Sequence, residues 1–158
     1  MKTVVIRECT DVSVQDSLIF ELKEMKINHC IGCWSCWWKT PGQCIYKDLE
    51  DFYREYVRAD KVVIVAELQE GFITSKMKSL FDRMIPLFLP YTHFRDGGTF
   101  HMPRYPKYPK VEFYYDYDFM DSKDYTIFYE YIYKVFEQFH SPEIKILPIS
   151  DLSKEGVS

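Results

Sequence analysis

The stretch Lys61–Ala66, KVVIVA, indicates the fold class more clearly than any other part of the chain. Its apolar residues follow one another without a polar break, which is typical of a strand buried on both faces of a parallel sheet. The preceding stretch Asp48–Arg58 places apolar residues at helical spacing, with Asp48 in position to cap the helix. We therefore expect a helix that leads into a central strand.

Strand and helix patterns continue to alternate on the carboxyl side of this strand. After a loop over Glu67–Thr74, the sequence predicts a helix over Ser75–Leu89 that is ended by Pro90. A second helix is expected over Ser122–Phe139. Further strands are expected over Lys110–Tyr117 and Pro142–Ile149. This alternation favours an α/β sheet with helices on both faces.

The amino-terminal part departs from this alternation. Thr3–Glu8, TVVIRE, and Ser17–Glu24, SLIFELKE, are both predicted as strands, and only the eight residues 9–16 connect them. A parallel pair usually needs a crossover of about a dozen residues or more. We therefore expect these strands to be antiparallel if they are neighbours, and the first βα unit to be shortened or missing.

Length and composition limit the class of protein. With 158 residues, 47% of them hydrophobic and 28% charged, the chain 1–158 is expected to form a single globular domain. The net charge of −4 gives no basic surface for nucleic acid. No run reaches the roughly 18 apolar residues of a membrane span, and the first residues are too charged for a signal peptide. We therefore expect a cytoplasmic protein with neither nucleic acid nor a membrane as a partner.

Four of the five cysteines lie between residues 30 and 44, in the spacing C-x2-C-x2-C-x7-C. Two-residue spacings let one tight loop turn three thiolates toward a common centre, and a fourth closes a tetrahedral set, as a [4Fe–4S] cluster requires. Four thiolates also suit Zn²⁺, and reduced cysteines also pack beneath tryptophans without any metal. The spacing leaves these three interpretations open. The candidate ligands are Cys30, Cys33, Cys36 and Cys44, whereas the isolated Cys9 is expected in the core.

Two aromatic-rich stretches indicate surfaces beyond the core. Trp34, Trp37 and Trp38 are all the tryptophan of the chain, and residues 91–109 hold Gly97-Gly98 and three prolines. We expect 91–109 to be a long irregular excursion, of the length that usually carries function or is mobile, and more like a lid than a linker. Together the two stretches supply more apolar area than one small domain exposes, so a homodimer or tetramer is expected.

The segment His29–Leu49, HCIGCWSCWWKTPGQCIYKDL, resembles the cysteine segment of the NADPH-dependent FMN reductase and iron–sulfur flavoprotein family. The likeness continues through Ala59-Asp60-Lys61 into Ser75–Arg83, SKMKSLFDR, which is similar to the helix after the family's flavin loop. It covers about residues 18–150, and its specific part is residues 29–83.

The resemblance implies a flavodoxin-like three-layer sandwich with a mostly parallel sheet, which binds FMN beyond the carboxyl ends of its strands. It assigns a [4Fe–4S] cluster to the four cysteines and places the loop after the central strand against the flavin ring. The residues expected there are Ala66, Glu67, Leu68, Gln69, Glu70, Gly71 and Phe72. Thr10 and Ser13, together with Ser17, are the hydroxyls available for the FMN phosphate.

Two departures from the family pattern concern FMN. The chain has no room for the helix whose amino end would meet the phosphate. In the flavin loop, Glu67, Gln69 and Glu70 stand where family members have a proline and aromatic residues. We therefore expect FMN to bind weakly.

The function implied is that of an NAD(P)H-dependent FMN reductase, or electron transfer of the iron–sulfur flavoprotein type, with a small molecule or a protein as the electron acceptor. The alternative is a degenerate family member without tight FMN binding, which acts as a partner-binding or metal-holding subunit. The missing phosphate-loop helix favours the alternative.

Overall fold

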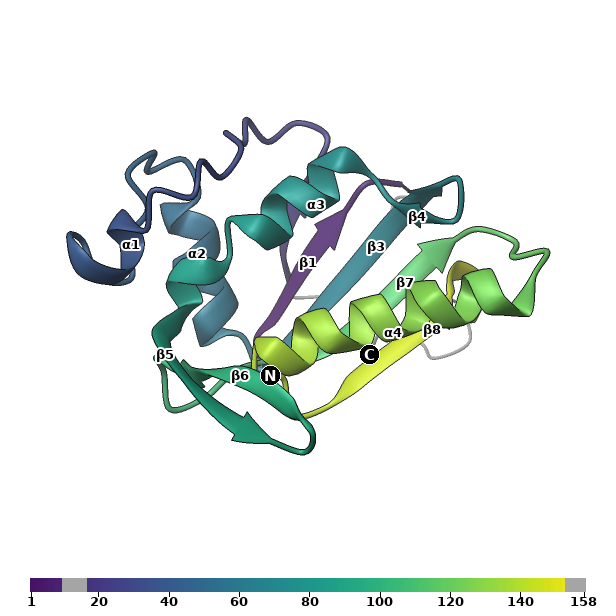
Figure 1. Ribbon diagram of the computed structural model, residues 1–158. Helices are drawn as coiled ribbons and strands as arrows, with labels where there is room; N and C mark the ends of the chain where they lie inside the picture. The colour runs from purple at the N-terminus through teal and green to yellow at the C-terminus, as the bar shows by residue number, and fades with distance from the viewer. Residues whose placement is uncertain (10–16, 153–158) are drawn as a thin grey trace.

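The computed structural model describes residues 1–9 and 17–152. Parallel strands form its central sheet in the order β2-β1-β3-β7-β8 (Figure 1). This is the strand order of flavodoxin-like folds, so the predicted α/β class with a mostly parallel sheet is confirmed. The strands are β1 (Thr3–Arg7), β2 (Ser17–Glu21), β3 (Lys61–Gln69), β7 (Lys110–Asp116) and β8 (Ile144–Pro148), and the short β4 (Phe72–Ile73) pairs antiparallel with β3.

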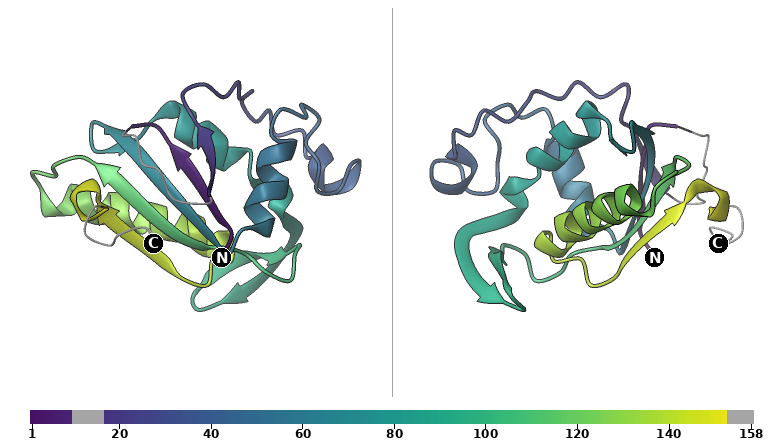
Figure 2. Two further views of the ribbon diagram at one scale, coloured as in Figure 1. Left: turned by 180° about the vertical axis from the view of Figure 1, so that it is seen from behind. Right: turned by 45° about the vertical axis from the view of Figure 1, so that its right-hand side comes forward.

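The helices α2 (Glu50–Arg58), α3 (Ser75–Asp82) and α4 (Ser122–Gln138) all cover one face of the sheet. Each joins two strands that are added in the same direction across the sheet, and right-handed crossovers then bring all of them to the same side (Figures 1 and 2). Within the described residues, the 3-10 turn η2 (Ile149–Asp151) is the one helical element that packs on the other face. The expected helices on both faces are therefore not found in this part of the chain.

Alternate residues of the central strands divide the interior into two clusters. The helix-facing cluster includes Ile6, Ile64, Phe113, Phe52, Leu80 and Phe136, all less than 2% exposed. The opposite cluster includes Val5, Val63, Val65, Tyr114 and Leu152, and the half-buried Cys9 packs against it. Because β3 buries side chains on both faces, its sequence needs the continuous apolar run with which it begins.

The pairing predicted for the first two strands is wrong. β1 and β2 are parallel, with Thr3 opposite Ser17 and Arg7 opposite Glu21. The nine residues 8–16 between the two strands span up to about 30 Å when extended, and a five-residue strand is only about 17 Å long. The chain is therefore long enough to reach the start of a parallel neighbour, and the usual crossover length of about a dozen residues is a preference rather than a limit.

Two expectations about helix ends also change. The helix expected over Ser75–Leu89 ends at Asp82, and Pro86 lies in the following 3-10 turn η1 (Ile85–Leu87). A proline in the interior of a helix removes a backbone hydrogen bond. Pro86 therefore prevents the helix from continuing to Pro90, the residue that was expected to end it. Asp48 does not cap α2, because Leu49 is the N-cap residue and makes no side-chain bond. No helix within residues 1–9 and 17–152 is long and apolar enough to cross a membrane.

The segment 91–109 is less irregular than expected. Most of it forms an antiparallel hairpin of β5 (Phe88–Arg95) and β6 (Gly98–Pro103), which projects below the main sheet in Figure 1. Asp96 and Gly97 make the turn with φ values of 51° and 76°, the left-handed conformation that tight hairpins need. The strand pairing shifts register between Phe88 and Thr92, and this irregularity accommodates Pro90 inside a strand.

Candidate functional site

The four clustered cysteines line one pocket at the edge of the helix layer. Its other lining residues are Ile31, Trp34, Ile45, Tyr46, Arg83, Ile85 and Pro86, most of them apolar. Cys30 and Cys33 are exposed, Cys44 is half-buried and Cys36 is buried. In the part of the chain that the structure describes, no three Cys, His, Asp or Glu side chains already stand in the geometry of a metal site. The chain thus gathers four sulfur atoms without fixing them as ligands.

Backbone turns on either side of Cys33 explain how this loop folds back on itself. Gly32 and Trp34 both have left-handed φ values, 63° and 60°. Glycine adopts this conformation freely, but a tryptophan rarely does, and the Trp34 ring packs edge-on against Trp37 at 4.9 Å between ring centres. The short helix α1 (Ser35–Trp38) begins directly after this turn and carries Cys36 inward.

The thiols differ in their electrostatic surroundings. Hydrogen bonds from the backbone and the hydroxyl of Ser35 lower the pKa of the Cys33 thiol. Burial, followed by the nearby Cys44, Cys30 and Cys33, raises the pKa of the Cys36 thiol to about 11. Four thiolates so close together repel one another, and a bound cation relieves this repulsion because metal ligands are deprotonated thiols.

A buried ion pair holds together the two ends of the cysteine segment, residues 29–49. Arg83 follows α3, is only 1% exposed, and forms a two-nitrogen pair with the carboxylate of Asp48. The same guanidinium donates to the carbonyl oxygen of Asn28 at 2.5 Å. Asn28 in turn donates to Asp48 from its backbone nitrogen at 2.9 Å and from its side chain at 3.0 Å. Residues just before Cys30 and just after Cys44 are therefore tied to one side chain.

This pairing explains why Asp48 is not a helix cap. Although partial burial acts to raise it, hydrogen bonds from Arg83 and Asn28 lower the pKa of Asp48 to about 2. The carboxylate therefore stays ionised at neutral pH and balances the charge of the buried guanidinium. In the sequence, the only sign of the Arg83–Asp48 pair is the position of Arg83 directly after an amphipathic helix.

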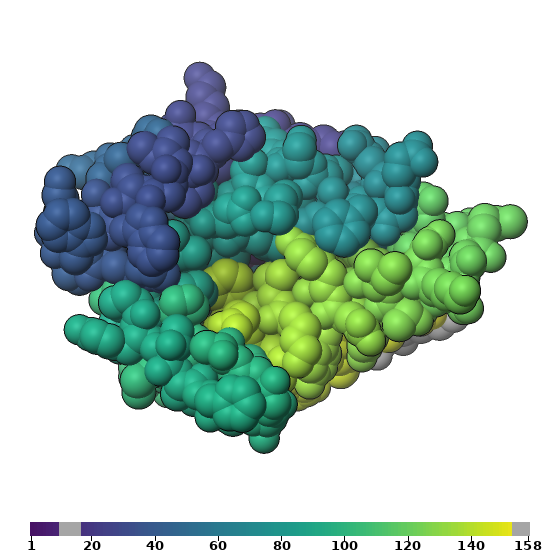
Figure 3. All heavy atoms as spheres, viewed as in Figure 1, coloured from purple at the N-terminus to yellow at the C-terminus, as the bar shows by residue number. Residues whose placement is uncertain are grey.

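Further contacts hold the cysteine segment on the protein body. His29 Nδ1 lies 2.8 Å from the hydroxyl of Ser79 in α3, and Trp37 Nε1 donates to the carbonyl oxygen of Ile85 at 3.1 Å. The Trp37 ring also lies 5.1 Å from His101 and 6.1 Å from Phe88, ring centre to ring centre. Figure 3 shows the segment in dark blue directly above the hairpin of β5 and β6.

The residues expected to edge a flavin form a β-hairpin rather than a loop. β3 extends to Gln69, and Glu70 and Gly71 make the turn into β4 with φ values of 51° and 76°. The expected loop at Glu67–Thr74 is therefore wrong, because strand pairing between Leu68 and Ile73 continues the sheet beyond the apolar run.

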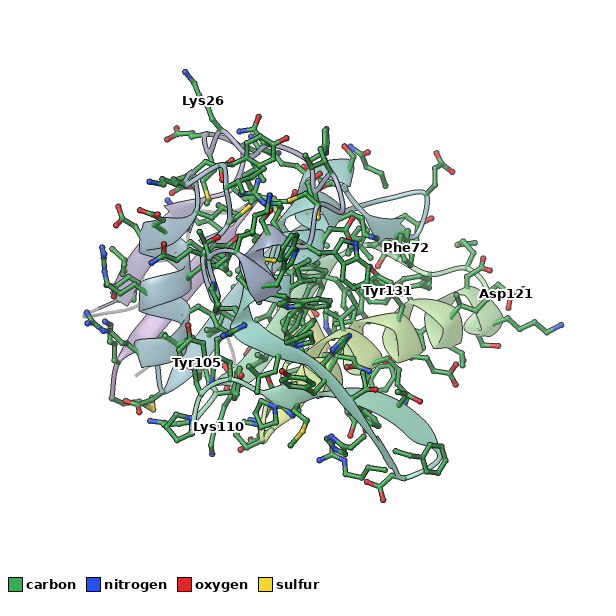
Figure 4. All side chains as sticks on the ribbon, turned by 60° about the vertical axis from the view of Figure 1, so that its left-hand side comes forward. Lys26, Phe72, Tyr105, Lys110, Asp121 and Tyr131 are labelled. Carbon is green, nitrogen blue, oxygen red and sulfur yellow. The ribbon has the colours of Figure 1, made fainter. Side chains whose placement is uncertain are left out.

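The side chains of this hairpin point in several directions. Ala66 is buried and pairs with Tyr115 of β7, and Leu68 is buried in the helix-facing cluster. Glu67 forms a 2.7 Å ion pair with Lys23, and Gln69 and Glu70 are exposed. Phe72 packs on Tyr131 of α4 at 4.7 Å between ring centres, with the ring planes tilted by 52°, and Figure 4 shows the two labelled residues close together. Thr10 and Ser13 lie outside the described residues.

Sequence reasoning missed Glu8, which lies at the carboxyl end of β1. Its side chain is buried, accepts a hydrogen bond from the backbone nitrogen of Glu67 at 3.2 Å, and accepts another from the hydroxyl of Thr74. Burial raises the pKa of Glu8 above its usual value. A buried acid here stands at the strand ends where flavodoxin-like folds bind their ligands. Its position at the end of an apolar strand was the only sign of it in the sequence.

Comparison with known proteins confirms the resemblance to iron–sulfur flavoproteins. No family model matches the chain. One iron–sulfur flavoprotein of Methanocaldococcus jannaschii is 38% identical over 65 residues, which is 40% of this chain and 32% of the relative. An iron–sulfur flavoprotein of Archaeoglobus fulgidus is 32% identical over 66 residues, or 41% of this chain and 29% of the relative. A second one from M. jannaschii is 28% identical over 89 residues, or 54% of this chain and 45% of the relative. The matched part is thus less than half the length of each of these relatives.

Solved structures support the fold over nearly the whole chain. An azoreductase from Bacillus anthracis has a TM-score of 0.62 at 10% identity, covering 99% of this chain and 92% of its own. An FMN-dependent NADH-azoreductase from B. anthracis has a TM-score of 0.52 at 15% identity, covering 93% of this chain and 85% of its own. At these identities the likeness is one of fold.

We predict that Asp48→Asn destabilises the protein by about 2 kcal/mol at pH 7, because it removes the counter-charge of a buried guanidinium. A carboxyl whose folded pKa is depressed adds stability above its unfolded pKa of 3.8, and this stability is lost as pH falls toward the folded value of about 2. The free energy of unfolding, measured with urea at several pH values, should therefore fall less steeply toward acid pH for the variant than for wild type. Asp51→Asn, at an exposed helix position, is the control and should stay within about 0.5 kcal/mol of wild type. Equal losses in both variants would contradict the assignment.

Proposed function

We propose that this chain is a redox domain of the iron–sulfur flavoprotein type that holds a [4Fe–4S] cluster through Cys30, Cys33, Cys36 and Cys44. The observation that carries the proposal is that all four cysteines of the C-x2-C-x2-C-x7-C pattern line the same pocket. The similarity of this chain to proteins named iron–sulfur flavoproteins supports it.

The residues present fit such a cluster by their chemistry. Four sulfur donors meet the requirement of [4Fe–4S] ligation, and Ile31, Trp34 and Ile45 line the pocket with apolar surface that limits access of water. When bound, the cluster supplies one-electron transfer. Cys36 and Cys44 are the inner donors, and Cys30 and Cys33 are the outer ones. Zinc held by the same four thiolates is the alternative metal.

We further propose that the whole protein passes electrons from NAD(P)H through FMN to a small molecule or a protein, as an FMN reductase or an electron-transfer flavoprotein. The FMN-dependent NADH-azoreductase among the structural neighbours agrees with this proposal in fold. The proposed FMN contacts are those of the β3–β4 hairpin, from Ala66 to Phe72, and of Thr10 and Ser13. The reducing cytoplasm is the proposed location, because exposed thiols such as Cys30 and Cys33 stay reduced there.

The described residues at this edge do not fit tight FMN binding by one chain. The buried Glu8 adds a negative group at the strand ends, and Glu67 and Glu70 add two more carboxylates nearby. This observation favours the second candidate function, a metal-holding or partner-binding subunit that retains the sheet and the cysteine segment. In that case, electrons enter and leave through a partner protein or through a flavin completed by another copy of the chain.

We also propose a homodimer or tetramer. Several large apolar side chains on the cysteine segment and the hairpin are exposed, which a stable monomer usually avoids over a wide area. They include Ile31, Trp34, Trp38, Tyr91 and Phe94, and the last three are 68%, 68% and 77% exposed.

For the cluster, we predict that protein reconstituted without oxygen binds iron and sulfide, and that Cys33→Ser loses most of the iron because an open coordination position remains. Elemental analysis for iron, sulfide and zinc, with the visible absorbance spectrum, measures this. Cys9→Ser is the control and should bind iron like wild type. Unchanged iron in Cys33→Ser would remove Cys33 from the ligand set, and zinc in place of iron would support the alternative metal.

For FMN, we predict that the flavin separates from a monomer during gel filtration. Charge-assisted hydrogen bonds contribute roughly 1.5–3 kcal/mol each, so losing two or three phosphate contacts weakens binding by several orders of magnitude. Glu8→Gln should tighten binding in a fluorescence titration because it removes a buried negative charge, whereas Asp51→Asn, at an exposed position of α2 outside the proposed FMN contacts, should change it little. A yellow monomer that survives gel filtration would show the prediction to be wrong.

For the oligomer, we predict that sedimentation at tens of micromolar protein, an order of magnitude suited to a moderately tight interface, shows a dimer or larger species. The double variant Trp38→Ala with Phe94→Ser should shift it toward monomer. Met120→Ser is the control, because Met120 is 98% exposed and lies away from both segments in sequence. A wild-type protein that is only monomeric under these conditions would count against the proposal.

A further inference from the structure

The guanidinium of Arg83 has one nitrogen without a partner. Two of its nitrogens bond to Asp48 and Asn28, but its buried Nε has no hydrogen-bond acceptor among the residues that the structure describes. An unsatisfied buried donor costs about 1–3 kcal/mol. Because this nitrogen is itself buried and lies beside the cysteine pocket, it indicates a ligand atom that completes it.

The pocket beside Arg83 limits what that acceptor is. Apart from the guanidinium itself, the lining side chains are apolar, sulfur-bearing or Tyr46. The Tyr46 ring lies 5.0 Å from the guanidinium carbon, in a cation–π contact that uses the ring face rather than the hydroxyl. Among the side chains that line the pocket, the remaining acceptors are the sulfur atoms of the four cysteines.

Electrostatics supports a sulfur neighbour. Although burial acts to lower it, the Asp48 hydrogen bond and then the nearby Tyr53 and Cys44 raise the pKa of Arg83. Cys44 and Arg83 also line the same pocket, and Cys44 is half-buried there. A thiolate or sulfide on that side of the pocket would gain a charge-assisted bond from Nε.

We propose that Arg83 Nε donates a hydrogen bond to a sulfur atom of the iron–sulfur centre held by the four cysteines, on the Cys44 side, and so raises the reduction potential of that centre. This inference rests on the proposed cluster. Arg83 is a positioning and tuning residue, because it touches the sulfur and binds no iron. Hydrogen bonds to cluster sulfurs are among the factors that set reduction potential.

The direction of the effect follows from charge. Reduction adds one electron to the centre, and a fixed N–H dipole stabilises the more negative state. Asp48 already balances the positive charge of Arg83, so the effect depends mainly on the directed bond. The bonds to Asp48 and Asn28 also fix the guanidinium before any cluster is present, and the donor therefore loses little freedom when the bond forms.

The test is a potentiometric titration of the reconstituted full chain, followed by electron paramagnetic resonance. Arg83→Lys keeps a positive charge beside Asp48 but has no donor at the Nε position. We expect the reduction potential of the Arg83→Lys variant to be about 59 mV lower than that of wild type. For one electron, this shift makes the reduced-to-oxidised ratio about tenfold lower at a fixed applied potential. Arg54→Lys, at an exposed ion pair of α2, is the matched control and should leave the potential unchanged.

A second variant keeps the proposal testable if Arg83→Lys fails to fold. Asp48→Asn retains Nε and removes the balancing charge, so it should raise the potential. Full iron content with an unchanged potential in Arg83→Lys would overturn the inference and leave the proposed cluster intact. Lost iron in that variant, with an unchanged potential in Asp48→Asn, would overturn it as well, since Arg83 would then only anchor the loop. Wild-type protein that binds no cluster would overturn both.

Discussion

The buried pair between Arg83 and Asp48 is the interaction on which the cysteine segment depends. Two cysteines of this segment are exposed, and Trp34 has a left-handed backbone conformation. The ends of the segment are brought together because one guanidinium bonds to both Asn28 and Asp48. Breaking a buried pair by removing one partner leaves an uncompensated charge, which is far more costly than losing a surface ion pair. The position of the four sulfurs is therefore set by a residue that follows α3, outside the segment itself.

The order in which strands are added to the sheet explains why the helices cover only one of its faces. From β2 the chain passes over β1 to β3, then to β7 and β8, always toward the same edge, and every helix on this path lies on one face. The opposite face is covered in part by Leu152 and Ile149, which close a small cluster around Val63 and Tyr114. Most of the large aromatic residues therefore gather on the helix side, where Phe113, Phe128 and Phe136 lie in ring contact.

Sequence patterns predicted the regular part of this fold and missed what depends on distant contacts. The strand beginning at Lys61 and the helix beginning at Ser122 follow from periodicity, because local spacing and burial agree there. The parallel β1–β2 pair was not predictable from the length of its connection, since the usual crossover length is a preference and not a limit. Asp48 had the local signature of a helix cap, but a buried arginine 35 residues away competes for its carboxylate. Glu8 resembled an ordinary strand end, and only the folded chain brings Thr74 to it.

Helix α3 links the two places where redox chemistry is proposed. Its first turn is capped by Thr74, whose hydroxyl also bonds to Glu8 at the strand ends, and its last turn leads into Arg83 beside the cysteine pocket. The nine residue steps from Thr74 to Arg83, across the eight residues of α3, correspond to about 14 Å along the axis. Because both ends of α3 are fixed by buried polar contacts, a shift of the helix along its axis would disturb both the Arg83–Asp48 pair and the contacts of Glu8 at the strand ends. The short helix therefore holds these two places at a constant separation.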